Sequence, residues 1–260
     1  MKKILIGLAA LTLMLGSCTK ENTEKAGSIQ GMGNTSGNFE VKAPFTLPQG
    51  ISVVGDINGL PKAGTKGGDS KSTAYSCYGS GGKMIKLKVT LLNRNDNQRT
   101  IFFPKGLLWK CDDAGYQDAI CLQTTWICLK ANSQRTITLD LYCINYGRTT
   151  SDNFAYYRFV GVTSSPIFNS LFKMIGWKMI NYEWINPPAK SDAVAGPTYD
   201  QITERMQNIV WNLTNIGKDV SDDDKAFIES IPELSATEIP VVDSQSQFPE
   251  YFEELIVSGL

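Results

Sequence analysis

The sequence predicts an α+β fold, in which an antiparallel β-sandwich or barrel is followed by a small helical subdomain. Two observations support this prediction. Short segments of alternating apolar and polar residues follow one another between positions 84 and 143, as is typical of antiparallel sheets. After Asn145 the pattern changes, and apolar residues recur at helical intervals.

The clearest strands are residues 84–91 and 136–143, because apolar and polar side chains alternate through both segments. The first is followed by a polar turn and the second is preceded by one, Ala131-Asn132-Ser133. Further strands are expected within 41–54, over 100–109 with a bulge or edge at 104–106, and at 118–122 and 125–129.

Three helices are expected after the strands. Residues 167–180 follow Ser165-Pro166 and have helical spacing. Residues 200–212 form a clear amphipathic helix, with apolar side chains at positions i, i+4, i+7 and i+8. Ser221 is expected to cap a shorter helix, and Asp224 stands where the acidic residue of a capping box would lie.

The first 18 residues have the pattern of an export signal that ends in a cysteine. Lys2 and Lys3 precede a short apolar stretch, 4–15, which has too few residues to span a bilayer as a helix. Gly16 and Ser17 then lead to Cys18. This ending resembles the lipobox of bacterial lipoproteins, and the resemblance implies cleavage before Cys18 and lipid on its thiol. Stable attachment needs more than one acyl chain.

The chain therefore divides into four predicted segments. Residues 1–17 are a signal peptide, and residues 18–38 are a lipidated flexible tether with little to bury. Residues 39–235 form the β-rich module with its helical part, and residues 236–260 are an acidic tail. The expected location is the bacterial outer membrane, where the lipid would hold the chain, with the module exposed at the cell surface.

Composition excludes several classes of function. The chain has no histidine, which excludes Ser-His-Asp and Cys-His catalysis and histidine-ligated zinc. No nucleotide-binding glycine motif is present. The net charge is −1, and loss of Lys2 and Lys3 with the leader makes the exported chain more acidic. We expect no metal, no cofactor and no nucleic-acid partner.

Five cysteines follow Cys18, an odd number for a chain in an oxidising compartment. Two disulfides would use four of them and leave one thiol, and the sequence does not choose among the three possible connectivities of four cysteines. The four candidates for disulfides are Cys77, Cys111, Cys121 and Cys128. The fifth is Cys143.

Two short motifs stand out from the rest of the chain. Tyr142-Cys143 lies near the end of the last predicted strand, and Tyr146 follows closely. Gln207-Asn208-Ile209-Val210-Trp211 lies in the amphipathic helix. A strand-borne Tyr-Cys followed by a helix with this glutamine pattern resembles the thioester domain of bacterial surface adhesins. The resemblance extends from about residue 83 to residue 212.

This resemblance implies a function. In thioester domains the cysteine thiol has condensed with the glutamine amide, and an amine on a partner surface attacks the bond. Cys143 would be the thiol and Gln207 the acyl donor, while Tyr142, Tyr146 and Trp211 would exclude water from the bond. The protein would be an adhesin rather than an enzyme, joined covalently to a protein or glycan of a host or neighbouring cell.

Two other functions stay open at the level of sequence. The first is a surface lipoprotein that binds protein or glycan without a thioester, with its loops as the site. The second, a hydrolase, would use Asp112, Asp113 and Asp118, which lie near cysteines. Aspartate is common in turns, and we expect turn formation to be the role of these three residues.

Overall fold

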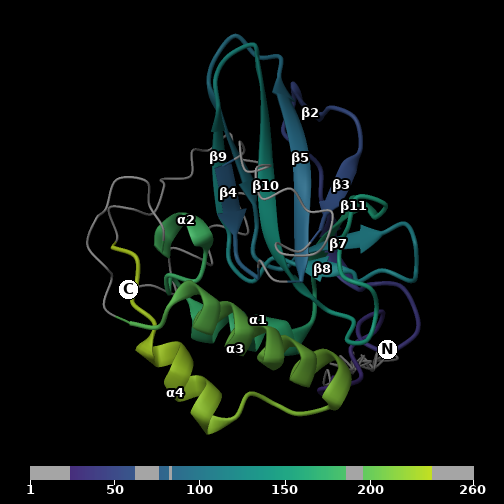
Figure 1. The fold of residues 1–260 in the computed structure, drawn as a ribbon, viewed down its shortest axis with the longest axis vertical. Coiled ribbons are helices and arrows are strands. Elements are labelled where there is room, and N and C mark those ends of the chain that lie inside the picture. The colour runs from purple at the N-terminus through teal and green to yellow at the C-terminus, as the bar shows by residue number, and fades with distance from the viewer. Residues whose placement is uncertain (1–23, 62–75, 82–83, 186–195, 236–260) are drawn as a thin grey trace, which may run out of the picture.

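The computed structural model describes residues 24–61, 76–81, 84–185 and 196–235. Its centre is a closed antiparallel barrel of six strands, in which each strand pairs with the next and β10 pairs with β5 to close the ring (Figure 1). In order around the barrel the strands are β5 (Ile85–Asn93), β3 (Ile57–Leu60), β11 (Tyr156–Thr163), β7 (Leu107–Cys111), β8 (Ala119–Ile120) and β10 (Ser133–Cys143). The predicted β-rich α+β class is confirmed.

Five further strands extend the barrel. β1 (Val41–Pro44) pairs with β11, and β2 (Ile51–Val53) pairs with one end of β5. β4 (Ser76–Gly79) lies parallel to β10, whereas the other strand pairs are antiparallel. β6 (Arg99–Phe103) and β9 (Thr125–Leu129) form a separate two-stranded sheet.

The barrel interior follows from the alternation seen in the sequence. Along β5 every second side chain is buried, from Ile85 to Asn93, and β10 contributes Ile137, Leu139 and Leu141 to the same core. Cys143 is the last member of that β10 row. Successive side chains of a strand point to opposite faces, so residues between these positions lie outside the barrel.

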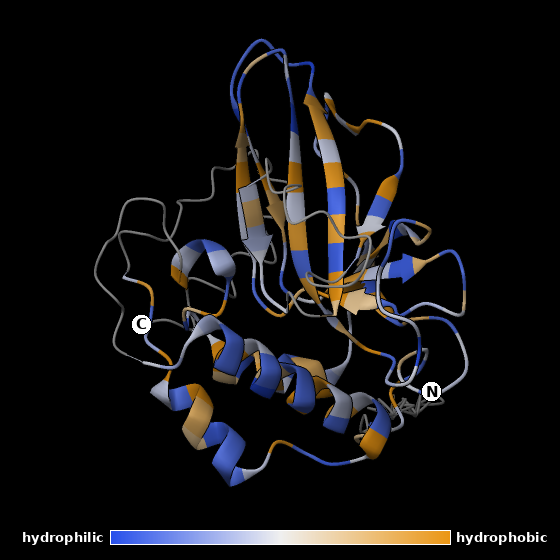
Figure 2. Cartoon of the chain, in the orientation of Figure 1, coloured by the Kyte–Doolittle hydropathy of each residue, from blue (hydrophilic) through white to orange (hydrophobic). Residues whose placement is uncertain are grey.

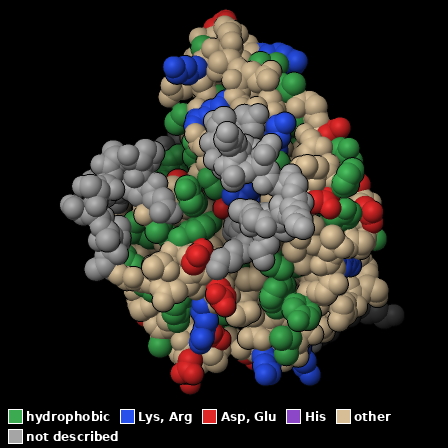
Figure 3. Space-filling model, viewed as in Figure 1, with side chains coloured by type: hydrophobic (Ala, Val, Ile, Leu, Met, Phe, Trp, Pro, Cys, Tyr) green, Lys and Arg blue, Asp and Glu red, His purple; other side chains and the backbone are tan. Residues whose placement is uncertain are grey.

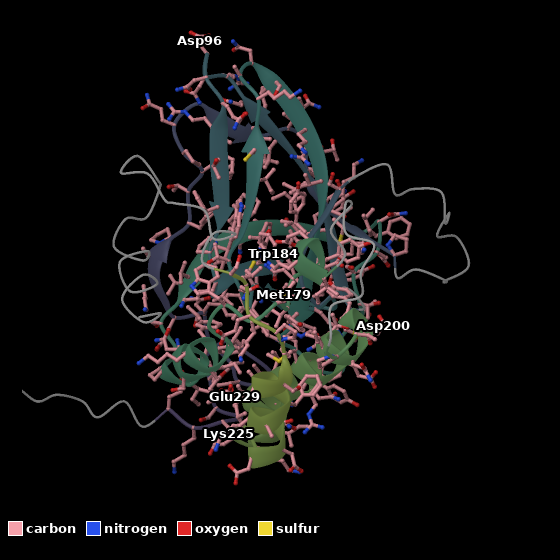
Figure 4. The ribbon with its side chains drawn as sticks, turned by 90° about the vertical axis from the view of Figure 1, so that its left-hand side faces the viewer. Asp96, Met179, Trp184, Asp200, Lys225 and Glu229 are labelled. Carbon is pink, nitrogen blue, oxygen red and sulfur yellow. The ribbon has the colours of Figure 1, made fainter. Side chains whose placement is uncertain are left out.

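Helices cover one end of the barrel (Figures 1 and 2). They are α1 (Pro166–Ile175), the short α2 (Tyr182–Ile185), α3 (Tyr199–Trp211), the π-helical turn η1 (Asn212–Ile216) and α4 (Asp222–Ser230). Apolar side chains of α1, α3 and α4 form a second core with the outer face of β10. Asp96, between β5 and β6, and Lys225 of α4 lie at opposite ends of the molecule (Figure 4).

The helix predictions are confirmed in part. Ser221 caps α4, and its side chain and that of Asp224 form the expected reciprocal capping box. The predicted helix over 167–180 is shorter, because Gly176 ends α1 with a positive φ of 49°. In the described part of the chain, none of these helices has both the length and the apolar character to cross a bilayer.

Two strand predictions need correction. Residues 100–109 do not form one bulged strand, because residues 104–106 turn the chain from β6 into β7, which belongs to the other sheet. β11 was not predicted at all, although Tyr156–Thr163 is rich in aromatic and β-branched residues. It closes the barrel between β3 and β7, so the sheet pairing extends past Asn145.

Part of the predicted tether belongs to the folded module. Ile29 and Met32 are buried in the helical core, at 2% and 1% exposure. The Gly27 N–H donates to the Leu213 carbonyl, and the Gly33 N–H donates to the Ile144 carbonyl. The prediction of a tether over 18–38 is therefore wrong for residues 24–38, because two apolar side chains and several backbone groups find partners there. Residues 1–17, Cys18 and 236–260 lie outside the described residues.

Candidate functional site

At Cys143, β10 is still paired with β8 on one side but is no longer paired with β5 on the other. The pairing of β10 with β5 ends at Leu141, opposite Ile85, whereas pairing with β8 continues to Cys143. The Ile144 N–H donates to the Asp118 carbonyl on the β8 side. Because alternate residues of a strand direct their backbone groups to opposite neighbours, the N–H and C=O of Cys143 face the side that β5 has left.

The side-chain amide of Gln207 occupies this open edge. The Cys143 N–H donates to Gln207 Oε1 at 2.9 Å, and Gln207 Nε2 donates to the Cys143 carbonyl at 2.8 Å. These two residues are 64 positions apart in the chain, and both are buried, at 0% and 5% exposure. The structure therefore brings together the two residues that the sequence singled out.

Two N–H groups point at the sulfur of Cys143. Trp211 Nε1 lies 3.4 Å from Sγ, and the backbone nitrogen of Asn145 lies 3.3 Å from it. Trp211 is one helical turn beyond Gln207, so both side chains project from the same face of α3. Burial raises the pKa of the Cys143 thiol to about 11, and the two hydrogen bonds oppose that rise.

The three predicted shielding residues have different positions. Tyr146 packs edge-on against the Trp211 indole, with ring centroids 4.8 Å apart, and is 59% exposed. The prediction that Tyr142 shields the sulfur is wrong. Tyr142 is fully buried in the helical core, on the face of β10 opposite to Cys143, because neighbouring strand residues point to opposite sides.

The loop after Cys143 is held by a buried polar cluster. Asn145 Oδ1 accepts a hydrogen bond from the Asp118 N–H, and Asn145 Nδ2 donates to the Gly33 carbonyl. The Asp118 carboxylate, 1% exposed, forms ion pairs with Lys110 at 2.8 Å and Arg148 at 3.2 Å. Asp118 was expected to serve a turn, and its buried ion pairs were not predicted from the sequence.

The other two aspartates have simpler roles. Asp113 accepts a hydrogen bond from the Gly115 N–H, as expected of a turn residue. Asp112 forms an exposed ion pair with Arg158.

The predicted disulfides are not present. Cys77, Cys111, Cys121, Cys128 and Cys143 are all free thiols. Three of the sulfur atoms contact other groups: that of Cys77 faces Lys86 Nζ, that of Cys128 faces Thr100 Oγ1, and that of Cys143 faces Trp211 Nε1. Cys77 is on β4, Cys128 is exposed on β9, and Cys111 and Cys121 are buried on and near different strands of the barrel. No group of three or more metal-ligating side chains is found among the described residues.

A second polar cluster lies on the outer face of β10 and was missed at the level of sequence. Lys86 Nζ is 3.1 Å from Asp140 Oδ1 and 4.0 Å from Cys77 Sγ, and the Tyr199 hydroxyl donates to Asp140 Oδ2 at 3.2 Å. Burial, and then the Asp140 charge, raise the pKa of Cys77 to about 12. Strand pairing between Lys86 and Asp140 creates this cluster, and sequence spacing gives no sign of it.

Comparison with known proteins gives no relative for this chain. No family model matches it, and neither the curated proteins nor the solved structures contain a significant match. What the site can do must therefore be argued from its own chemistry. A buried thiol, a carboxamide against the backbone of the same cysteine, and an aromatic cover are groups suited to acyl transfer.

Proposed function

We propose that the protein is a surface-anchored lipoprotein and an adhesin that carries an internal thioester between Cys143 and Gln207. The observation that carries this proposal is the seating of the Gln207 carboxamide on the backbone of Cys143, through hydrogen bonds of 2.9 and 2.8 Å. A carboxamide is a weak electrophile, so fixed proximity must supply most of the rate of bond formation. In support of the proposal, the two hydrogen bonds hold the Gln207 amide against the backbone of Cys143, where the end of β10 meets α3.

The hydrogen bonds also suit the chemistry of bond formation. The Cys143 thiol would attack the Gln207 carbonyl carbon, forming the C–S bond. The Cys143 N–H donates to the carbonyl oxygen, where negative charge develops in such a reaction. The C–N bond then breaks, and the nitrogen leaves as ammonia after it takes the thiol proton. Thiol and amide are converted to thioester and ammonia, with no oxidant or cofactor.

Water must be kept from such a bond until an amine arrives. Cys143 is fully buried, and Trp211 contacts both the sulfur and the exposed ring of Tyr146. An amine of a partner protein or glycan, reaching the site past these two rings, would attack the carbonyl carbon. The products would be an amide on Gln207 and a free thiol on Cys143, so that partner and protein become covalently joined.

Intact mass spectrometry tests the thioester. The mature chain produced without its leader and Cys18 should have a mass lower by one ammonia than its sequence requires. Methylamine should add to it and free one thiol. Cys143→Ala should restore the sequence mass, whereas the control Cys111→Ala, which removes another buried free thiol, should keep the deficit.

A wild-type chain of full mass, with Cys143 open to alkylation after unfolding, would contradict the thioester. The Gln207 amide would then serve only to satisfy the strand edge, and a surface protein that binds protein or glycan without a covalent bond would be favoured.

The lipid anchor is tested separately. We propose that Cys18 carries lipid and holds the protein in the outer membrane, because the residues before it resemble a lipobox. Radiolabelled palmitate should enter the wild-type chain in cells and be absent from Cys18→Ser. Equal labelling of the two chains would contradict the anchor without affecting the thioester proposal.

A further inference from the structure

The sulfur of Cys143 has two hydrogen-bond donors that the formation of a thioester does not require. Trp211 Nε1 is 3.4 Å from Sγ, and the Asn145 backbone nitrogen is 3.3 Å from it. A neutral thiol is a weak acceptor, whereas a thiolate is a strong one, because hydrogen bonds to charged groups are stronger. Both donors therefore favour the anionic form of the sulfur.

We propose that Trp211 is a catalytic residue, whose indole N–H, together with the Asn145 backbone N–H, stabilises the sulfur of Cys143 as a thiolate during acyl transfer. This inference rests on the proposed thioester and assigns the control of its reactivity. The sulfur is the nucleophile when the bond forms and the leaving group when an amine displaces it. The sulfur carries negative charge as a thiolate before the bond forms and again when the bond breaks, and fixed dipoles are effective at such a point.

The transfer step balances without a histidine. The amine nitrogen forms a bond to the Gln207 carbonyl carbon, and the C–S bond breaks with its electron pair moving to sulfur. The amine loses one proton to water, and the thiolate later takes one from water. Trp211 and Asn145 hold the sulfur through the interval in which it is charged.

The surroundings of the two donors make them rigid. Tyr146 packs edge-on against the Trp211 ring, and the Tyr146 N–H donates to Asn215 Oδ1 of η1 at 3.1 Å. Asn145 is fixed by its side-chain bonds to Asp118 and Gly33. A donor that is already aimed at the sulfur needs no reorganisation when the charge appears. The environment would otherwise oppose a thiolate, since burial raises the pKa of Cys143.

The matched test uses Trp211→Phe, which keeps an aromatic ring and removes the N–H, with Trp184→Phe as control. The Trp184 indole N–H has no hydrogen-bond partner among the described residues. In the full mature chain, we expect methylamine incorporation to be about tenfold slower in Trp211→Phe and unchanged in Trp184→Phe. An unchanged rate in a folded Trp211→Phe chain that keeps the ammonia deficit would overturn the inference.

A second measurement does not depend on the thioester. Alkylation of the free Cys143 thiol is followed against pH, after methylamine treatment or directly if no deficit exists. The midpoint should move to higher pH in Trp211→Phe, because a thiolate has lost a donor. An unmoved midpoint would overturn the hydrogen bond from Trp211 to the sulfur. Absence of the deficit in wild type would contradict the proposed function and the acyl-transfer role together, and this measurement would then decide only whether Trp211 stabilises the thiolate.

If Trp211→Phe does not fold, the wild-type chain still provides a test. The Trp211 indole N–H resonance, observed by NMR, should shift when Cys143 is replaced by alanine, and the Trp184 resonance should not. A Trp211 resonance at the same position in both chains would overturn the inference.

Discussion

β10 carries two polar clusters, a buried one on its inner face and a half-buried one on its outer face, and each contains a cysteine and a side chain of α3. On the inner face Cys143 meets Gln207 and Trp211, and on the outer face Cys77 meets Asp140, which accepts a hydrogen bond from Tyr199. N–H donors surround the first sulfur, whereas a carboxylate lies beside the second. The buried thiol of Cys143 and the half-buried thiol of Cys77 therefore differ in their polar neighbours, since the charges of both Asp140 and Lys86 act on Cys77.

The two pKa values reflect this difference. Burial is the first cause of the rise in both, to about 11 for Cys143 and about 12 for Cys77. At Cys143 the next causes are hydrogen bonds that lower the pKa, while at Cys77 the next cause is the charge of Asp140, which raises it. The comparison indicates that hydrogen-bond donors, and not burial, distinguish the surroundings of Cys143 from those of Cys77.

The largest effect is expected from Gln207→Leu. The leucine would leave the Cys143 N–H and C=O buried without partners, and each such group costs about 1–3 kcal/mol. We expect the free energy of unfolding to fall by about 3 kcal/mol in chemical denaturation. The matched control on the same helix is Tyr199→Phe, which removes one hydroxyl from the outer cluster and should cost about 1 kcal/mol. Equal losses would show that the hydrogen bonds of the two clusters contribute equally to the free energy of unfolding.

A smaller loss is expected from Gly33→Ala, which tests whether the N-terminal segment supports the inner cluster. A Cβ on Gly33 would lie 2.0 Å from the Thr214 carbonyl oxygen, and its φ is +60°. We expect a cost of about 2 kcal/mol in denaturation, together with faster alkylation of the free Cys143 thiol. Gly55→Ala is the control, since its φ of +68° is similar and no atom lies within 4 Å. Its cost should be about 1 kcal/mol, with no change at Cys143.

Asp140→Asn should separate the two cysteines. The variant removes the charge that raises the pKa of Cys77 and leaves Lys86 without its ion-pair partner, at a cost of about 1 kcal/mol. Alkylation of Cys77, followed by peptide mass against pH, should shift to lower pH. The profile of Cys143 should not move, because Asp140 points to the other face of β10. A shift at both cysteines would contradict the separation of the clusters.

A pH-dependent effect is expected at Glu183, which accepts a hydrogen bond from the Gly79 N–H at 2.8 Å and so links α2 to the strand that carries Cys77. Burial raises the pKa of Glu183 from 4.5 to about 7. The folded protein therefore holds the proton more tightly than the unfolded chain. This contribution to stability is complete below about pH 4.5 and is lost as the pH rises through about 7.

In thermal unfolding between about pH 5 and pH 8, we expect Glu183→Gln to show a weaker decline in the unfolding midpoint than the wild type. The matched substitution Glu229→Gln, on an exposed carboxylate of α4 (Figure 4), should leave the decline unchanged. Parallel curves for the wild type and Glu183→Gln would contradict the raised pKa.

Local patterns accounted for much of the fold. Strict alternation located β5 and β10, and capping residues located the start of α4. β11 was not predicted, because the helical spacing of the residues that follow it outweighed its own aromatic and β-branched composition. The burial of Ile29 and Met32 could not be predicted, since two apolar residues in a polar segment acquire a place to bury only when α3 and η1 are assembled.

The space-filling view adds a property of the surface that composition alone leaves undetermined. Acidic and basic side chains are interspersed over the helical end on the visible described face (Figure 3). The exposed apolar side chains include Tyr146 and Ile216, in segments that the Tyr146–Asn215 hydrogen bond joins.

The sequence by itself determined the classes of chemistry open to this protein and singled out the pair Cys143 and Gln207. The absence of histidine is a fact of composition, and the two motifs are local, so neither required coordinates. Only the tertiary structure decided which neighbours surround the sulfur. Because side chains alternate along a strand, Tyr142 lies on the face of β10 opposite to Cys143. The pairing of β10 with β5 stops at Ile85, and Gln207 occupies the strand edge that is left open. These outcomes depend on where pairing stops and which face is buried, and the whole sheet fixes both.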